Sequence, residues 1–402
     1  GAGVVGHRGW DGSRIAADGG SGTGGTIVAW SDGATTFDGT ITATGGYSGG
    51  FVETSGKFDL GIGANASVSL GGGGTWLLDP RNVSIVRPDG TDVSGGTTNP
   101  PNGSGPYTIN ADSIETALDG GSDVTITTEQ ARRNDLGDIL VLSPLNWTGT
   151  GALSLVADED VTISQSITTE RGNFFAIADD DIEIEAPVTS TGSADLVFRT
   201  LGITTFAGSQ VRIYDNVIAS GTGNIEVDAQ KGPVRFLGNA STNLIMRTQS
   251  GDLSINAGSA DRPSEQWDFG VVIAERESNQ SGSNIQIHSR SGSVDITADS
   301  RIDLNGGNGR SGKWVRVGRT DSSSDVTLTA PVISITGGDK TNNFSEAVAG
   351  SGGSLSMRAD TITLQNGAGF ARALAQSGAG LSMLAETQTW NGRVEAGTDP
   401  VT

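Results

Sequence analysis

The sequence contains no cysteine among its 402 residues. This absence excludes disulfide bonds, cysteine-ligated zinc and catalysis by a thiol. Histidine is almost absent too, with His7 near the N-terminal end and His288 in an alternating segment. A Ser-His-Asp site would have to use one of these two, and no Gly-x-Ser-x-Gly elbow lies between a strand and a helix.

Basic residues are few, since 25 Lys and Arg stand against 46 Asp and Glu, for a formal net charge of −21. Such a charge repels nucleic acid and anionic membranes and keeps a large surface soluble. No segment approaches the roughly 18 apolar residues that a membrane span needs. The opening residues, Gly1-Ala-Gly-Val-Val-Gly-His-Arg, lack the pattern of a signal peptide. We therefore expect an internal segment or a processed form, with any secretion signal upstream.

A short strand is repeated many times, with glycine and polar residues between the copies. Gly151-Ala-Leu-Ser-Leu-Val-Ala is followed by Gly172-Asn-Phe-Phe-Ala-Ile-Ala, and later by Gly223-Asn-Ile-Glu-Val-Asp-Ala. Apolar and small polar residues alternate in each copy, as in a half-buried strand. A unit that returns about every twenty residues buries its apolar side only by stacking on its neighbours. The pattern predicts an all-β, parallel β-helix solenoid with loop insertions.

Three segments are expected along the chain: a glycine-rich β-helix part over 1–86, a loop with one short docked helix over 87–122, and β-helix repeats over 123–402. Pro80 should mark a corner between two strands, because proline cannot donate a ladder hydrogen bond. The helix is expected over Ala111–Leu118, and it ends before two glycines. Asp112 is the expected N-cap, with Glu115 three residues later as in a capping box.

Polar excursions interrupt the later repeats. They are expected at Ser259–Asp268, Asn305–Gly312 and Thr336–Gly353. Insertions in a solenoid emerge as loops on one side and often carry recognition.

One stretch has more specific motifs. Gly24-Gly-Thr-Ile-Val-Ala-Trp-Ser-Asp-Gly-Ala-Thr-Thr-Phe-Asp-Gly-Thr-Ile-Thr-Ala, Gly49-Gly-Phe-Val-Glu-Thr-Ser-Gly and Leu77-Leu-Asp-Pro-Arg-Asn-Val-Ser-Ile resemble filamentous-haemagglutinin-type large exoproteins. These adhesins are the secreted partners of two-partner secretion systems in Gram-negative bacteria, and the resemblance is specific over about residues 24–190. It implies a right-handed parallel β-helix at the cell surface, acting in adhesion, aggregation or biofilm. It also implies an outer-membrane transporter as partner, through sequence upstream of this chain, and it carries over no catalytic or ligand residues.

Two acidic clusters, Asp158-Glu-Asp160 and Asp179-Asp-Asp181, recur at the same place in successive repeats. Stacking would gather their carboxylates on one edge, which suits Ca²⁺. Aspartate also favours turns, so a solvated corner is the simpler interpretation. No other cofactor is expected.

A basic and aromatic cluster stands out in this acidic chain. Its members are Arg310, Lys313, Trp314, Arg316 and Arg319. The basic groups could hold an anionic sugar while the indole stacks on its ring. The favoured alternative is a strand whose basic side chains pair with acids on adjacent turns, with Trp314 in the core.

Trp267, in a polar loop, is a second candidate for ligand contact. With it, the candidate contact residues number six, and none is assigned a catalytic or metal-binding role.

The expected function is a secreted structural or adhesive rod that contacts a surface glycan, a matrix or a neighbouring copy. The first alternative is a polysaccharide-active enzyme, a lyase or glycoside hydrolase, on the same scaffold. Such an enzyme needs two carboxyl groups roughly 5–10 Å apart across a groove, with a basic residue nearby. A self-assembling extracellular filament or sheath subunit is the remaining alternative, because open β-helix ends invite stacking.

Overall fold

The computed structural model describes residues 2–5, 12–56, 59–87, 108–128, 137–202, 209–237, 243–258, 270–274, 284–306 and 313–397. By its contacts the chain divides into two units. Unit 1 comprises Gly1–Ile182 with Ser190–Ala194, and unit 2 comprises Glu183–Thr189 with Asp195–Thr402. Each is described separately below.

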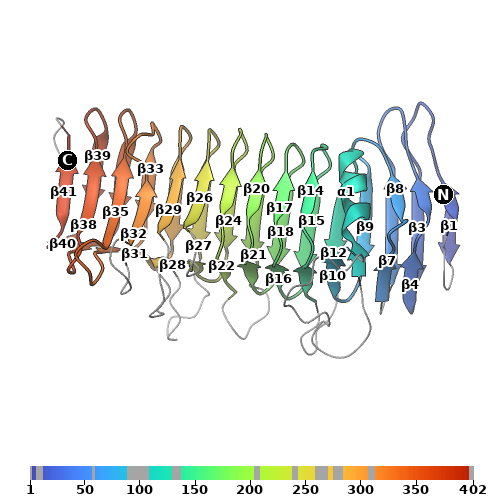
Figure 1. The fold of residues 1–402 in the computed structure, drawn as a ribbon, viewed down its shortest axis with the longest axis horizontal. Coiled ribbons are helices and arrows are strands. Elements are labelled where there is room, and N and C mark those ends of the chain that lie inside the picture. Colours follow the sequence, from blue (N-terminus) through green and yellow to red (C-terminus); the bar gives the residue numbers. More distant parts are fainter. Residues whose placement is uncertain are drawn as a thin grey trace. The chain divides into compact units, whose positions relative to one another are not determined.

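Both units are built from parallel strands that pair with the strands of the preceding and following coil, where a coil is one turn of the solenoid (Figure 1). The pattern of long parallel sheets and a single helix in the described residues confirms the predicted parallel β-helix. No helix of the described residues has the length and hydrophobicity to cross a bilayer.

Unit 1 has three sets of strands, which form successive sides of each coil. The first, in pairing order, is β1 (Ala2–Val5), β3 (Thr26–Ser31), β6 (Phe51–Gly56), β9 (Thr75–Asp79), β12 (Asp123–Thr127), β15 (Leu153–Ala157) and β18 (Phe174–Ala178). The second is β4 (Ala34–Phe37), β7 (Asp59–Ile62), β11 (Thr108–Asn110), β10 (Val83–Val86), β13 (Ile139–Val141) and β16 (Val161–Ile163). The third comprises β2 (Arg14–Ala16), β5 (Thr40–Thr42) and β8 (Ser67–Ser69), and separately β14 (Leu145–Trp147) and β17 (Ile167–Thr169).

Unit 2 has the same three sides. The first is β21 (Leu196–Thr200), β24 (Ile225–Ala229), β27 (Leu253–Ala257), β30 (Val294–Ala298), β33 (Val326–Thr329), β36 (Ser354–Arg358) and β39 (Gly380–Leu384). The second is β22 (Val211–Ile213), β25 (Val234–Phe236), β28 (Gly270–Ala274), β31 (Arg301–Asn305), β34 (Val332–Thr336), β37 (Thr361–Gln365) and β40 (Thr387–Trp390). The third is β23 (Val217–Ala219), β26 (Leu244–Thr248), β29 (Ile285–Ser289), β32 (Trp314–Gly318), β35 (Phe344–Ala349), β38 (Ala371–Ala375) and β41 (Arg393–Ala396).

Two short strands, β19 (Ile182–Ile184) and β20 (Val188–Ser190), contain the division between the units. The three sequence segments with boundaries at residues 86 and 122 differ from this division and stay a prediction.

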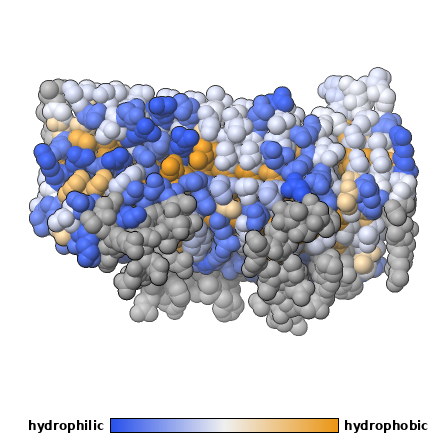
Figure 2. All heavy atoms as spheres, viewed as in Figure 1, coloured by the Kyte–Doolittle hydropathy of each residue, from blue (hydrophilic) through white to orange (hydrophobic). Residues whose placement is uncertain are grey.

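The core consists of inward side chains that stack in register from coil to coil. On the first side of unit 2, one such column is fully or almost fully buried: Leu196, Ile225, Leu253, Val294, Val326, Leu355 and Leu381. Along each strand, the residues next to an inward one point outward, because side chains alternate along a strand. On the face shown in Figure 2, the coloured surface is mostly hydrophilic or near neutral, with apolar areas of limited extent.

Polar side chains at the corners connect successive coils. In unit 2, Asp195 accepts a hydrogen bond from the amide of Asn224 (2.8 Å), and Asn224 Oδ1 accepts one from the amide of Asp252 (2.8 Å). Asp252 in turn accepts one from the amide of Ser293 (2.7 Å). These bonds satisfy amides that lie just before the strands of the first side. The recurrence of Asp and Asn at this position therefore has a structural cause.

The predicted corner at Pro80 is confirmed, since β9 ends at Asp79 and β10 begins at Val83. The predicted excursion Thr336–Gly353 was partly wrong, because Phe344–Ala349 forms β35. Ser345 and Glu346 of β35 are fully buried. Because these polar residues break the alternation of apolar and polar residues, the strand was not recognised in the sequence. The excursion Ser259–Asp268 lies outside the described residues, as do residues 307–312 of the excursion Asn305–Gly312, whose first residue ends β31.

The predicted helix is α1 (Ala111–Asp119), which lies between β8 and β14 and contacts both (Figure 1). The expected N-cap at Asp112 was wrong. Asn110 is the N-cap, and its Oδ1 accepts from the amides of Asp112 (2.7 Å) and Ser113 (3.2 Å). Asparagine caps as well as aspartate, and Asn110 stands one residue before the first helical position. Gly121, with φ of +81°, turns the chain away after the helix.

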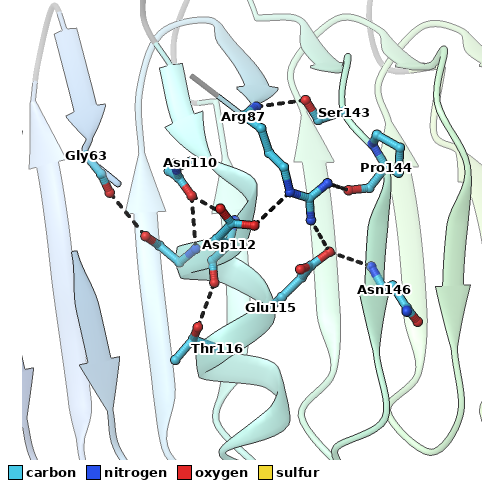
Figure 3. A network of polar contacts seen from close by, with 10 residues as sticks. Gly63, Arg87, Asn110, Asp112, Glu115, Thr116, Ser143, Pro144 and Asn146 are labelled. Atoms are coloured by element: carbon cyan, nitrogen blue, oxygen red, sulfur yellow. Dashed lines mark hydrogen bonds and ion pairs between the residues drawn. The ribbon is translucent and has the colours of Figure 1, made fainter. Parts of the chain in front are cut away.

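Arg87 joins α1 to the neighbouring coils (Figure 3). Its guanidinium donates to Asp112 (2.7 Å), Glu115 (2.6 Å) and the carbonyl of Pro144 (2.5 Å). Glu115 also accepts from the amide of Asn146 (2.7 Å). The side chains of Arg87 and Glu115 are only 20% and 18% exposed, so this pair is better shielded than an ordinary surface ion pair.

We expect Arg87→Ala to lower the free energy of unfolding by about 2 kcal/mol, because it removes charge-assisted hydrogen bonds and leaves Glu115 without its cation. Urea denaturation of the variant and the parent chain measures the difference. Asp112→Ala is the matched control. Its carboxylate is 59% exposed, so the expected loss is below about 1 kcal/mol. Equal losses for the two variants would contradict the assigned role of Arg87.

Candidate functional site

The sequence-predicted contact residues in the described part lie in unit 2, on β32 and next to it. Lys313 and Arg319 flank the strand, and Trp314 and Arg316 are on its outward face. Arg310 and Trp267 lie outside the described residues. Of the four candidates in the described part, Lys313, Trp314 and Arg316 thus lie together, and Arg319 lies at the other end of the strand.

Trp314 belongs to a stack of three aromatic rings from successive coils, together with Phe344 and Phe370. The Trp314 and Phe344 centroids are 6.0 Å apart with planes at 10°, and the Phe344 and Phe370 centroids are 4.7 Å apart with planes at 3°. The expectation that Trp314 lies in the core was wrong, because its side chain is half-buried on the outer face. Because each ring covers its neighbour, the ring edges and part of Phe370, which is 39% exposed, are what this stack offers to a ligand.

Beside the rings runs a column of charged side chains, Arg316, Glu346 and Arg372, in register on β32, β35 and β38. Glu346 is fully buried and pairs with both arginines, accepting from Arg316 Nε through Oε1 and from Arg372 Nε (3.0 Å) through Oε2. The two guanidiniums also lie over the rings. Arg316 is 5.0 Å from the Trp314 centroid, and Arg372 is 5.4 Å from that of Phe370. Cation–π contact and ion pairing therefore act together here.

We call this arrangement the basic–aromatic face: Lys313, Trp314, Arg316, Phe344, Glu346, Phe370 and Arg372. The sequence reasoning missed Phe344, Glu346, Phe370 and Arg372, which stand 30 to 58 residues after Trp314 in the chain. The available signal was the register between coils, since residues one coil apart become direct neighbours.

At the other end of β32, Arg319 pairs with Asp321 through two hydrogen bonds, one of them 2.7 Å long from a terminal guanidinium nitrogen to Oδ2. The hydrogen bond from Arg319 holds the pKa of Asp321 below its usual range, and the bond to Asp321 raises the pKa of Arg319. The buried imidazole of His288 lies nearby. Burial lowers its pKa to about 4, and the positive charges of Arg319 and Arg247 act in the same direction.

The two acidic clusters lie together in unit 1, as stacking predicts. The amide of Asp181 donates to Asp160 (2.9 Å), and that of Asp160 donates to Asp138 (3.3 Å). Burial raises the pKa of Glu159 to about 7, and four neighbouring aspartates add to the shift. Calcium binding there stays a prediction. Among the described residues no group of three or more His, Cys, Asp or Glu is arranged to hold a metal ion.

A shallow groove of about 580 Å³ lies at one corner of unit 2, between the first and second sides. Asp299, Asp360 and Glu386 line it, with Arg358 and Leu384. All five side chains are exposed. A groove with several acids and a basic residue is what the enzymatic alternative requires. However, a general acid working near neutral pH is normally a buried carboxyl group, and these are not.

No protein-family model matches this chain, and no significantly similar protein is found among curated proteins. The arguments about function therefore rest on the chain's own residues and on the motifs between residues 24 and 190.

Glu159 gives a pH-dependent contribution to stability whose sign follows from its pKa. The pKa in the folded chain is about 7 and the ordinary value is 4.5, so the folded state holds this proton more tightly. Its contribution to stability is largest below pH 4.5 and falls as the pH rises toward 7 and beyond. We expect Glu159→Gln to raise the free energy of unfolding at pH 8 by about 1 kcal/mol, a value reduced for solvent screening. At pH 4 it should have little effect.

Chemical denaturation at the two pH values tests this, with Glu53→Gln on β6 as the control outside the acidic corner. A loss of stability at pH 8 in Glu159→Gln would show that the carboxylate is stabilising and that the assigned repulsion is wrong.

Proposed function

We propose that this chain is the β-helical part of a secreted protein on a bacterial outer surface, which mediates adhesion, aggregation or contact with a biofilm matrix. The motifs over residues 24–86 support this proposal, because their residues supply β3, β4, β5, β6, β7, β8, β9 and β10 of a parallel β-helix. That is the architecture implied by the resemblance to filamentous-haemagglutinin-type exoproteins. An outer-membrane transporter, reached through upstream sequence, is the secretion partner in this proposal.

The observation that carries an adhesive role is the basic–aromatic face. The chain has a net charge of −21, yet this face presents two guanidiniums on three stacked rings, held by the buried carboxylate of Glu346. Arginine and aromatic edges fixed in this way suit an acidic glycan, because little side-chain entropy is lost on binding. The regular coils on either side support a structural role for the rest of the described chain.

A second candidate function is favoured by the corner groove. Asp360 and Glu386 line it from adjacent coils, whose strands are about 4.8 Å apart. This backbone spacing is compatible with the carboxylate separation that retaining glycoside hydrolases use. The exposure of these two side chains supports binding over catalysis, and we rank this function below adhesion.

Binding of the purified chain to a glycan array tests the proposal. We expect binding to a subset of acidic glycans. Phe370→Ala should weaken it roughly two- to tenfold, the size of one lost aromatic contact. Trp314→Phe should weaken it less, since a smaller ring still stacks on Phe344, and Trp267→Ala tests the second aromatic candidate. Trp30→Ala is the matched control, because Trp30 is 38% exposed on β3 of unit 1.

Absence of binding to any glycan, or equal losses in Phe370→Ala and Trp30→Ala, would contradict the adhesive proposal. Release of reducing ends or unsaturated products from a glycan, abolished in Glu386→Gln, would replace it with the enzymatic one.

A further inference from the structure

A second cluster of basic side chains lies where the third side of unit 2 meets the first, on β26, β29 and the turn after β32. Arg247 and His288 are register partners on β26 and β29, so both side chains leave the same face. Arg290 follows β29 directly, and Arg319 follows β32. The pKa of His288 responds to the charges of Arg247 and Arg319, and that of Asp321 to Arg290. The four groups are therefore close enough to interact electrostatically, either with one another or through Asp321.

The cluster differs from several other outward arginines of this unit in how little negative charge surrounds it. Arg316 and Arg372 share Glu346, Arg199 pairs with Glu226 and Asp228, and Arg212 pairs with Glu183. At the cluster, the register partner of Arg247 on β29 is His288. Its neutral imidazole does not balance the charge of the guanidinium, as a carboxylate at that position would. Within the described residues, Arg247 and Arg290 make no ion pair.

One carboxylate faces the cluster, and it already binds one arginine. Asp321 accepts two hydrogen bonds from Arg319. Its single charge is set against three guanidiniums, so a net positive charge of about two units remains in a chain that is otherwise strongly acidic.

His288 supplies an independent observation. Its side chain is 3% exposed, and its Nδ1 atom is buried with no hydrogen-bond partner in the described structure. Buried polar atoms are normally satisfied, and an unsatisfied one requires an explanation. The charges of Arg319 and Arg247 oppose protonation of this imidazole, so an anion that binds to those arginines would make protonation easier.

We propose that Arg247, Arg290 and Arg319 form an oxyanion site, with His288 as its floor, for a sulfate or phosphate group that is either free or carried as an ester on a glycan. Two or three guanidinium groups around one tetrahedral anion match the fork geometry that arginine uses for such groups. Asp321 acts as the internal competitor that occupies Arg319 when no ligand is bound. The glycan form of this ligand rests on the proposed adhesive function, whereas the free ion does not.

The test follows the imidazole of His288 by NMR, in a His7→Gln background that leaves His288 as the sole histidine. The pKa of His288 is about 4 in the free chain. We expect inorganic sulfate or phosphate to raise it, because a bound anion offsets the two guanidiniums. Arg247→Gln should also raise it in the absence of the anion.

Measuring the affinity of the variants for the same ions distinguishes a specific site from non-specific attraction by positive charge. Arg247→Gln and Arg319→Gln should each weaken sulfate binding about tenfold, the effect of losing one charge-assisted hydrogen bond. Asp321→Asn should strengthen it, because the competing carboxylate is removed. Arg212→Gln, which alters an ion pair elsewhere in the unit, is the control and should leave binding unchanged.

Dextran sulfate compared with plain dextran separates the two sources of the anion. Tighter binding of the sulfated polymer than of sulfate, lost in Arg247→Gln, identifies an ester on a glycan, whereas equal affinity identifies a free ion. A His288 pKa that does not move at saturating sulfate, or binding that is unaffected by the Arg247 and Asp321 variants, overturns the site. The basic–aromatic face and its Phe370→Ala test would be untouched by that result.

Discussion

The stacking of each coil on the next in a fixed parallel register is the constraint on which the other features depend. It places like positions of successive coils about 4.8 Å apart. Most inward positions are therefore apolar from coil to coil, as in the column from Leu196 to Leu381. The amides that precede the strands need acceptors as well, and Asp195, Asn224 and Asp252 supply them to the following coil. The backbone hydrogen bonds between coils, the stacked core residues and the corner side chains thus all specify the same register.

The same register decides what outward charges do. Where opposite charges fall in one column, they neutralise each other, as Glu346 does between Arg316 and Arg372. Where acids fall together, as around Glu159, their repulsion and partial burial raise a carboxyl pKa to about 7. Where an arginine meets a neutral histidine, positive charge is left over. An ionic ligand is therefore expected where the charges of a column do not cancel, as in the cluster around His288, whereas the basic–aromatic face offers arginines and rings that are already held in place.

The amount that could be predicted from the sequence depended on how local the signal was. Period-two alternation predicted strands such as Thr26–Ser31, and apolar spacing before two glycines predicted α1. The N-cap was misassigned by two residues, because Asn110 and Asp112 both suit that role. The strand β35 was missed because its buried Ser345 and Glu346 break the expected alternation.

The candidate site was less accessible to sequence reasoning. Trp314, Arg316 and Arg319 drew attention because they are adjacent in the chain. Their partners Glu346 and Phe370 come from later coils, and insertions of unequal length between coils hide that register. Without the register, neither the pairing of Arg316 nor the position of Arg247 beside His288 follows from composition or spacing.

Amide hydrogen exchange at the corners tests the stacking register most directly. The amides of Asp181, Asn224, Asp252 and Ser293 precede or lie outside strands, yet each donates to a side chain of the preceding coil. The account predicts that they exchange as slowly as strand amides in their own unit. Exchange of these four amides at the rate of free loop residues, with the strand amides protected, would contradict it.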